Sequence, residues 1–194
     1  WQITPIALGT TNSKKTTSAM EPTYTVCKTP DSEEEQFGLV LTYNRQSKQN
    51  IISYLVGTCE NGVPKLSLYK FSAENNVVGI AQLNNQIEQD TTISSELEKL
   101  NTSGTKLTRE IKIIPINNTL LYVEPVYQVM LNDEDEIPVL KKVIVASGST
   151  VAIGDNIEEA LTNLFTDYAV DINVVDMEDI SAIIDSVIKA ESNL

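Results

Sequence analysis

The chain has 194 residues, 41% of them hydrophobic, and carries a net charge of −13. That length suits one domain with a core of its own, without disulfides or metals to support it. The acidic balance argues against a nucleic-acid partner and against docking on an anionic membrane, because both need clustered Lys and Arg. The sequence contains no histidine, which excludes Ser-His-Asp and Cys-His catalysis, histidine-ligated zinc and the usual pH switch.

The start of the chain predicts an irregular segment before the first strands. Residues 1–22 are polar and lack an apolar period, so we expect a flexible N-terminal segment or linker there. Alternating residues then predict strands over 23–27 and 36–43, which we expect to pair as a hairpin.

The next stretch predicts a short helix followed by a strand. Ser47 suits the N-cap of a helix over 48–56, and Gly57 is typical of a helix C-terminus. The apolar residues of this stretch fall at helical spacing, namely Ile51, Ile52, Leu55 and Val56. Residues 66–71 alternate as a strand.

Residues 80–104 predict two amphipathic helices. Apolar residues recur at steps of three and four, and Asp90 or Thr92 breaks the run and caps the second helix. Gly104 is expected to end that helix.

The strongest pattern covers residues 107–130 and predicts a β-hairpin. Its turn is expected at residues 117–118, because Asn tolerates the left-handed region. The expected register pairs Pro115 with Leu120. Since prolines remove backbone donors, we expect a bulge or a sheet edge at Pro125.

The remainder predicts two more strands and two more helices. Strands are expected over 141–146 and 150–153, and Asn156 is expected to cap the helix that follows. Asp176 begins the last predicted helix, whose apolar stripe consists of Ile180, Ile183, Ile184, Val187 and Ile188.

The elements add up to an α+β fold, mostly antiparallel sheet with amphipathic helices packed on one face or end. We expect three parts: a flexible N-terminal segment over 1–22, a single α+β domain over 23–170 and a C-terminal helical extension over 171–194. The stripe of the extension either docks on the domain or binds a partner.

Several short blocks of the sequence together resemble one protein family. In chain order they are residues 50–55, 79–82, 87–90, 93–94, 114–116, 120–127, 138–146 and 158–161. Together they resemble the exported C-terminal part of uncharacterised protein family 0182, multi-spanning bacterial membrane proteins. The likeness runs from about residue 20 to residue 166, and the block Leu-Leu-Tyr-Val-Glu-Pro at 120–125 is its most specific part. Two departures are Tyr54 in place of Trp and Ile80 in place of Pro.

The resemblance implies several N-terminal transmembrane helices followed by a soluble part on the extracytoplasmic side of the cell membrane. The sequence itself has no run of about 18 apolar residues, so we expect no direct bilayer insertion by this segment. A chain that opens on Trp1, without an initiator Met or a signal peptide, is expected to be a part of something longer. The family has no established activity, so the resemblance provides no catalytic residues.

Glu124 is the first candidate for ligand contact, because it lies inside the most specific block. It could act as a lone general base or bind a cation of a partner. Alternatively it is structural, either satisfied by backbone N–H groups or paired with Arg109 or Lys112 across the hairpin.

Tyr122 and Tyr127 are the other candidates for ligand contact, together with Tyr43 and Tyr69. Tyrosines on strands could stack against sugars, or they could form half-buried core.

Neither a metal nor another cofactor is expected. The acidic residues 133–136, with Asp31 and residues 33–35, could bind calcium, but they lack the spacing of a calcium loop and are more typical of a solvated surface loop. Cys27 and Cys59 are either two separate buried thiols or a disulfide that closes a long loop.

We therefore expect a non-catalytic binding or assembly module of the cell envelope. Its partners would be the rest of the same membrane protein and an envelope protein or wall polymer. The alternative is the soluble part of an envelope enzyme or transporter whose site is completed by membrane helices.

Overall fold

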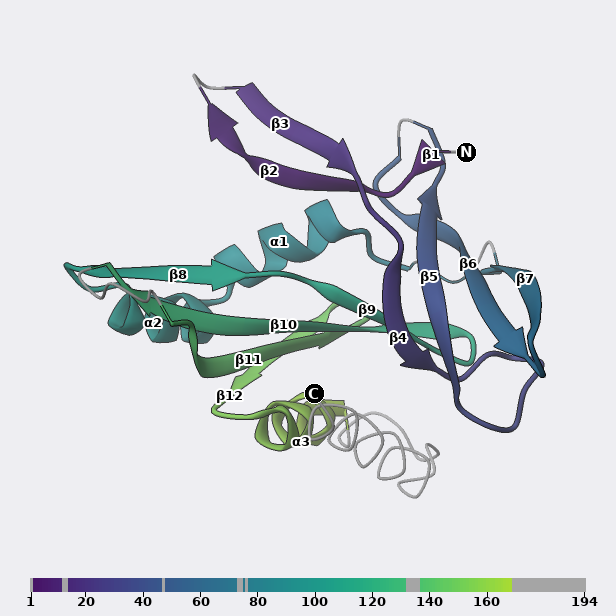
Figure 1. Cartoon of the computed structure of the whole chain (residues 1–194). Coiled ribbons are helices and arrows are strands. Elements are labelled where there is room, and N and C mark those ends of the chain that lie inside the picture. The colour runs from purple at the N-terminus through teal and green to yellow at the C-terminus, as the bar shows by residue number, and fades with distance from the viewer. Residues whose placement is uncertain are drawn as a thin grey trace.

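The computed structural model describes residues 2–11, 14–46, 48–72, 75, 77–131 and 137–168. These residues form two five-stranded antiparallel sheets, a separate two-stranded hairpin and three helices (Figure 1). The predicted α+β class is confirmed. The predicted acidic loop at 133–136 and the predicted extension over 171–194 lie outside the described residues.

The first sheet is built from the N-terminal half of the chain. It comprises β1 (Gln2–Ile3), β4 (Thr23–Cys27), β5 (Gln36–Asn44), β6 (Ile51–Glu60) and β7 (Val63–Lys70). The strand order is β1-β5-β6-β7, and β4 also pairs with β5. The predicted hairpin of β4 and β5 is confirmed, as is the strand predicted over 66–71.

The expectation of an irregular start is wrong for most of residues 1–22. This stretch contains β1 and a hairpin of β2 (Pro5–Thr11) and β3 (Lys14–Ala19). Hydrogen bonds rather than an apolar period hold its base, since the Thr4 hydroxyl donates to Asn44 Oδ1 at 2.6 Å and Met20 N donates to Thr4 O at 2.9 Å. Threonine also favours extended backbone. The domain boundaries at 22 and 170 stay a prediction.

The helix predicted over 48–56 is also wrong, because residues 51–60 form β6. The β-branched Ile51, Ile52 and Val56 suit a strand, and β6 pairs with β5 on one side and β7 on the other. Gly57 lies inside this strand, where a Cβ would touch the Leu66 side chain at 3.2 Å. Tertiary pairing thus outweighs a helical spacing that a short apolar run satisfies equally well.

The second sheet is built from the C-terminal half. It comprises β8 (Thr105–Arg109), β9 (Lys112–Ile116), β10 (Thr119–Met130), β11 (Val139–Ser147) and β12 (Thr150–Gly154). The strand order is β12-β11-β10-β8, and β9 also pairs with β10.

The hairpin of β9 and β10 has the predicted turn and register. Asn117 has φ of 50°, and Pro115 pairs with Leu120. Pairing on this side of β10 stops after Val123 and resumes with β8 at Val126, so Pro125 lies in an interruption of the ladder. The ladder with β11 shifts at the next step, between Val126 and Tyr127. The irregularity expected at Pro125 is therefore confirmed.

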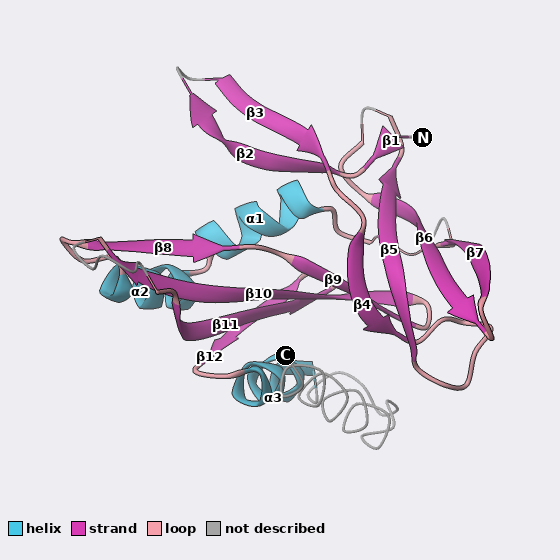
Figure 2. Cartoon of the chain, viewed as in Figure 1, coloured by secondary structure: helices cyan, strands magenta, loops and turns pink. Residues whose placement is uncertain are grey.

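The helices cover both faces of the second sheet (Figure 2). They are α1 (Ile80–Gln89), α2 (Thr91–Leu100) and α3 (Ile157–Tyr168). Asp90 caps α2 by accepting a hydrogen bond from Ile93 N at 2.8 Å, and Asn156 accepts one from Glu159 N at 2.9 Å at the start of α3. Both caps were predicted.

Two hydrophobic clusters lie on opposite faces of the second sheet. The first joins the inner face of the first sheet to α1, α2 and one face of the second sheet, through residues such as Val40, Tyr54, Leu83 and Tyr122. The second fills the space under α3 and includes Ala160, Leu161 and Leu164. None of the helices within the described ranges has the length and apolar character needed to cross a membrane.

Candidate functional site

Glu124 lies on the face of β10 that packs against the first hydrophobic cluster. Along β10, Tyr122, Glu124 and Val126 alternate towards that face, so Glu124 is only 5% exposed. The nearest charge is on β8, where Arg109 pairs with Val126. Arg109 Nε lies 3.7 Å from Glu124 Oε1. Of the two cations proposed for the structural alternative, the fold brings Arg109 to Glu124, while Lys112 pairs with Glu110 at 2.8 Å.

The environment of Glu124 favours the neutral acid. Burial raises the pKa of the carboxyl group above its usual value, and the charge of Arg109 lowers it by a smaller amount. Oε2 is buried and has no hydrogen-bond partner among the described residues. A carboxyl group of this kind can hold a proton or give one up, provided that a substrate can reach it.

Two surface pockets lie next to α2, and neither is lined by Glu124. One has a volume of about 560 Å³ and includes Leu97, Leu107 and Arg109. The other has a volume of about 360 Å³ and includes Ile93 and Asn163. Tyr122 and Tyr127 also line neither pocket. The polar groups of the predicted site therefore do not converge on either of these cavities.

The fold places Tyr122 and Glu124 on one face of β10 and separates Tyr127 from them. Tyr122 shares the inner face of β10 with Glu124, is 2% exposed and donates a hydrogen bond from its hydroxyl to the Val78 carbonyl. Burial raises its pKa above the usual value. Tyr127 points to the opposite face and is 36% exposed. Tyr69, a further sugar-stacking candidate, stacks against Tyr54 with ring centroids 5.1 Å apart.

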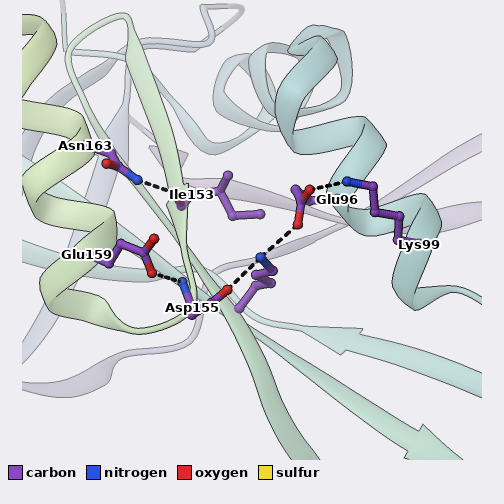
Figure 3. A network of polar contacts seen from close by, with 7 residues as sticks. Glu96, Lys99, Ile153, Asp155, Glu159 and Asn163 are labelled. Atoms are coloured by element: carbon purple, nitrogen blue, oxygen red, sulfur yellow. Dashed lines mark hydrogen bonds and ion pairs between the residues drawn. The ribbon is translucent and has the colours of Figure 1, made fainter.

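A charged cluster that sequence reasoning missed lies between α2 and α3 (Figure 3). Lys142 of β11 places Nζ 2.8 Å from Glu96 Oε2 and 2.6 Å from Asp155 Oδ1. Lys99 Nζ lies 2.5 Å from the other oxygen of Glu96. Asp155 N in turn donates to Glu159 Oε2 at 2.8 Å. We call Glu96, Lys99, Lys142 and Asp155 the lysine clasp.

The lysine clasp shifts the pKa values of its members. Hydrogen bonds from Lys142, and then from Lys99, lower the pKa of Glu96 to about 2. Hydrogen bonds to Asp155 and Glu96 raise the pKa of Lys142. Glu96 and Lys99 are an i,i+3 pair on α2, whereas Lys142 is distant in the chain from both carboxylates that it contacts, so no local motif could have revealed its part in the cluster. The arrangement connects α2, β11 and the turn before α3, and its central cation, Lys142, contacts two carboxylates.

The two cysteines are free thiols. Cys27 is buried, and burial raises the pKa of its thiol to about 11, whereas Cys59 is exposed. The alternative of two separate thiols is therefore confirmed, except that Cys59 is exposed rather than buried. Over the part of the chain that the structure covers, no three Cys, Asp or Glu side chains are grouped so that they could hold a metal ion.

Comparisons with known proteins give one consistent result. The model of the Uncharacterised protein family (UPF0182) matches residues 1–100. A UPF0182 protein of Desulforamulus reducens is 34% identical over 155 residues, covering 78% of this chain and 16% of the relative. A second from Microcystis aeruginosa is 35% identical over 150 residues, covering 76% and 15%. One from Trichodesmium erythraeum is 30% identical over 181 residues, covering 89% and 20%.

The chain thus spans about a sixth of the length of most of the curated relatives that it matches. No solved structure matches it.

Proposed function

The chain belongs to the Uncharacterised protein family (UPF0182), and from that premise we propose that it is an extracytoplasmic module of a polytopic bacterial membrane protein. In this proposal it is a non-catalytic domain that serves binding and assembly in the cell envelope. Its first partner is the rest of the same membrane protein, and an envelope protein or wall polymer is the second. The membrane topology comes from the resemblance of residues 20–166 to the exported part of the family, and the relatives are long enough to contain such an anchor.

The observation that carries the non-catalytic part of the proposal is the enclosure of Glu124. Among the residues whose burial the structure describes, it is the one charged residue that is buried, and it lies in the most specific block of the resemblance. Its partner is Arg109 on the neighbouring strand, and neither pocket beside α2 reaches it. A buried acid in that position joins strands β8 and β10 rather than presenting a reactive group to a substrate.

The location is tested by labelling one added thiol from outside the cell. Glu158 is exposed on α3, so Glu158→Cys in a Cys59→Ser background offers a reactive group on the surface. A membrane-impermeant maleimide should label this variant in intact cells as completely as in lysed cells. The Cys59→Ser protein without the added cysteine is the control. Labelling that requires lysis would reject the extracytoplasmic location.

The non-catalytic role is tested by complementation. A strain that lacks the protein and shows an envelope defect should be rescued as well by Glu124→Gln as by the natural sequence, because glutamine keeps the shape of the side chain. Immunoblotting confirms that the variant accumulates normally. Failure of a normally folded Glu124→Gln protein to complement would point to proton chemistry at this position.

One observation favours a second candidate, the soluble part of an envelope enzyme or transporter. Glu124 Oε2 is buried without a hydrogen-bond partner among the described residues, and such an oxygen is available to a group supplied by membrane helices. In that case Glu124→Gln abolishes complementation although the protein reaches the membrane.

A further inference from the structure

The outer face of the first sheet is apolar and lacks a covering layer among the described residues. Residues that pair across antiparallel strands point to the same face, and one such row runs Tyr24–Leu39–Gly57–Leu66 through β4, β5, β6 and β7. We define the apolar sheet face as Tyr24, Phe37, Leu39, Leu55, Leu66 and Leu68.

Three of these side chains are more than two-thirds exposed, which is unusual for their size. Tyr24 is 70% exposed, Phe37 67% and Leu66 74%, and Leu68 is 46% exposed. The rings of Tyr24 and Phe37 stack, with centroids 5.6 Å apart and planes 4° apart. The stacking covers part of each ring and leaves the rest in solvent.

On β5 the bulkier apolar side chains point towards solvent, which is the reverse of the pattern expected for a sheet with one solvated face. On β5 the core side presents Gly38, Val40 and Thr42, whereas the solvent side presents Phe37 and Leu39. In an antiparallel sheet with one solvated face, the larger apolar residues are expected on the core side. A strand with bulky apolar residues on its outer side is typical of a sheet that is covered on both faces.

Strand β7, at the edge of the sheet, also carries bulky apolar residues on its outer side. Leu66 and Leu68 point outwards, while Ser67 and Tyr69 face the core side. Pro64 lacks a backbone donor and is typical of an edge strand that does not accept a further strand. The features therefore favour a partner that packs on the face over one that pairs along the edge.

We propose that the apolar sheet face is an internal interface of the natural-length protein, covered by a part of the same polypeptide that lies outside these 194 residues. This inference rests on the proposed function only in that the chain is one piece of a larger membrane protein. The relatives are about six times longer than the matched segment, so ample polypeptide exists to form the second layer. A covering segment on the same chain also has a far higher effective concentration than a second molecule.

The lack of charge in the central row indicates that the covering surface is apolar. The row Tyr24–Leu39–Gly57–Leu66 contains no charged residue, although the chain carries a net charge of −13. A matching surface must therefore be apolar at its centre, because an unpaired charge buried there would be costly. Exposed apolar patches of this kind mark interaction sites in soluble domains.

The first test compares thiol reactivity in the natural-length protein. Leu66→Cys and, separately, Glu158→Cys are made in a Cys59→Ser background, and both react with a maleimide in lysed cells under native conditions. Each rate is divided by the rate after denaturation. We expect Cys at 66 to react about tenfold or more slowly than Cys at 158, because a covered thiol reacts only when the interface opens. Equal rates would overturn the proposal, and Leu68→Cys repeats the comparison at a second position.

The second test identifies the covering segment. A photo-crosslinking amino acid at position 66 of the natural-length protein is activated, and the cross-linked peptides are mapped by mass spectrometry. Cross-links to the same polypeptide outside these 194 residues, without a gain in mass on a gel, support the proposal. Cross-links within the 194 residues, to a second copy or to another protein would overturn it.

The two proposals fail in different ways. The native and denatured reaction rates of the cysteine at position 66 are both measured in lysed cells, so they do not depend on the side of the membrane on which the domain lies. A protein in which Glu158→Cys is labelled only after lysis, while position 66 is protected, would lose the extracytoplasmic location and keep the internal interface.

Discussion

Glu124 shows how a single buried carboxyl group makes stability depend on pH. Burial raises its pKa, and Arg109 at 3.7 Å offsets part of that effect. An acid whose pKa is raised on folding stabilises the native state most at low pH, where it is protonated in both states. That advantage is lost as the pH rises from the unfolded pKa through the folded one.

The first prediction follows from the direction of the pKa shift of Glu124. Glu124→Gln removes the titration, so the free energy of unfolding of the variant should improve relative to the natural protein as the pH rises from 4 to 7. Urea unfolding at a series of pH values measures the difference. Glu98→Gln, at an exposed site on α2, is the control for the loss of one carboxylate from the chain. A difference for Glu124→Gln that shrinks over the same range would contradict the assigned direction.

Tyr122 provides a second prediction at the scale of one residue. Its hydroxyl donates to the Val78 carbonyl inside the core, so Tyr122→Phe leaves a buried acceptor unsatisfied. We expect a loss of about 1–2 kcal/mol in the free energy of unfolding, measured from urea midpoints. Tyr24→Phe should change it by less than about 0.5 kcal/mol, because that ring is 70% exposed and its hydroxyl stays hydrated. Equal losses in both variants would show that the buried hydrogen bond contributes nothing.

The elements of the second sheet are held together by polar contacts as well as by apolar packing. The lysine clasp connects α2 to β11 and to the turn that begins α3. Because the pKa of Glu96 lies below its usual value, its contribution to stability is present above about pH 4.5 and lost as the pH falls towards 2.

The third prediction concerns this clasp. Lys142→Met should raise the pKa of Glu96 from about 2 towards its usual value, because Lys142 is the largest cause of the shift. Lys99→Met should raise it less. An NMR titration of the Glu96 carboxyl carbon measures both changes. An unchanged value in Lys142→Met would mean that the contact does not form in solution.

Local chemistry explains which elements could be predicted from the sequence. The cap at Asp90, the turn at Asn117 and the interrupted ladder at Pro125 all depend on backbone preferences of the residue itself. Such preferences act within a few residues, so a sequence reveals them directly.

The elements that sequence reasoning missed depend on distant partners. Residues 51–56 fit a helical period and became a strand because β5 and β7 pair with them. The N-terminal hairpin is held at its base by hydrogen bonds of Thr4, which an apolar pattern does not reveal.

The candidate site follows the same division. The pairing of Glu124 with Arg109 was one of two predicted options, because both residues lie on the predicted hairpin. The contacts of Lys142 in the lysine clasp join three separate parts of the chain and left no local signal. The apolar sheet face did leave one, since Phe37 and Leu39 alternate with Gly38 and Val40 along β5.

At the scale of the whole molecule, the two sheets share one core. Tyr54 of the first sheet donates a hydrogen bond from its hydroxyl to Asn117 O at 3.1 Å, in the turn of the second. Lys28 N, just beyond β4, donates to Pro115 O at 3.2 Å. The first hydrophobic cluster contains residues of both sheets and of α1, so neither half buries its apolar face alone.

The fourth prediction is that the described body unfolds in one transition. Cys27 lies in the first sheet, where burial keeps its thiol unreactive, so its labelling reports on that sheet. Circular dichroism reports on the secondary structure of the whole chain. In urea the two curves should have the same midpoint. Labelling of Cys27 at a clearly lower urea concentration would show that the first sheet opens independently.

The apolar sheet face also affects the solubility of the chain of 194 residues. At neutral pH a charge of −13 keeps molecules apart, although Leu66 and Phe37 remain in contact with water. Near the isoelectric point, about pH 4.3, that repulsion vanishes and the face remains. Salt acts in the same direction, because the screening length shrinks from about 10 Å at 0.1 M to about 3 Å at 1 M. With this face exposed, the chain of 194 residues should therefore precipitate in mild acid and remain soluble better in dilute buffers than in concentrated ones.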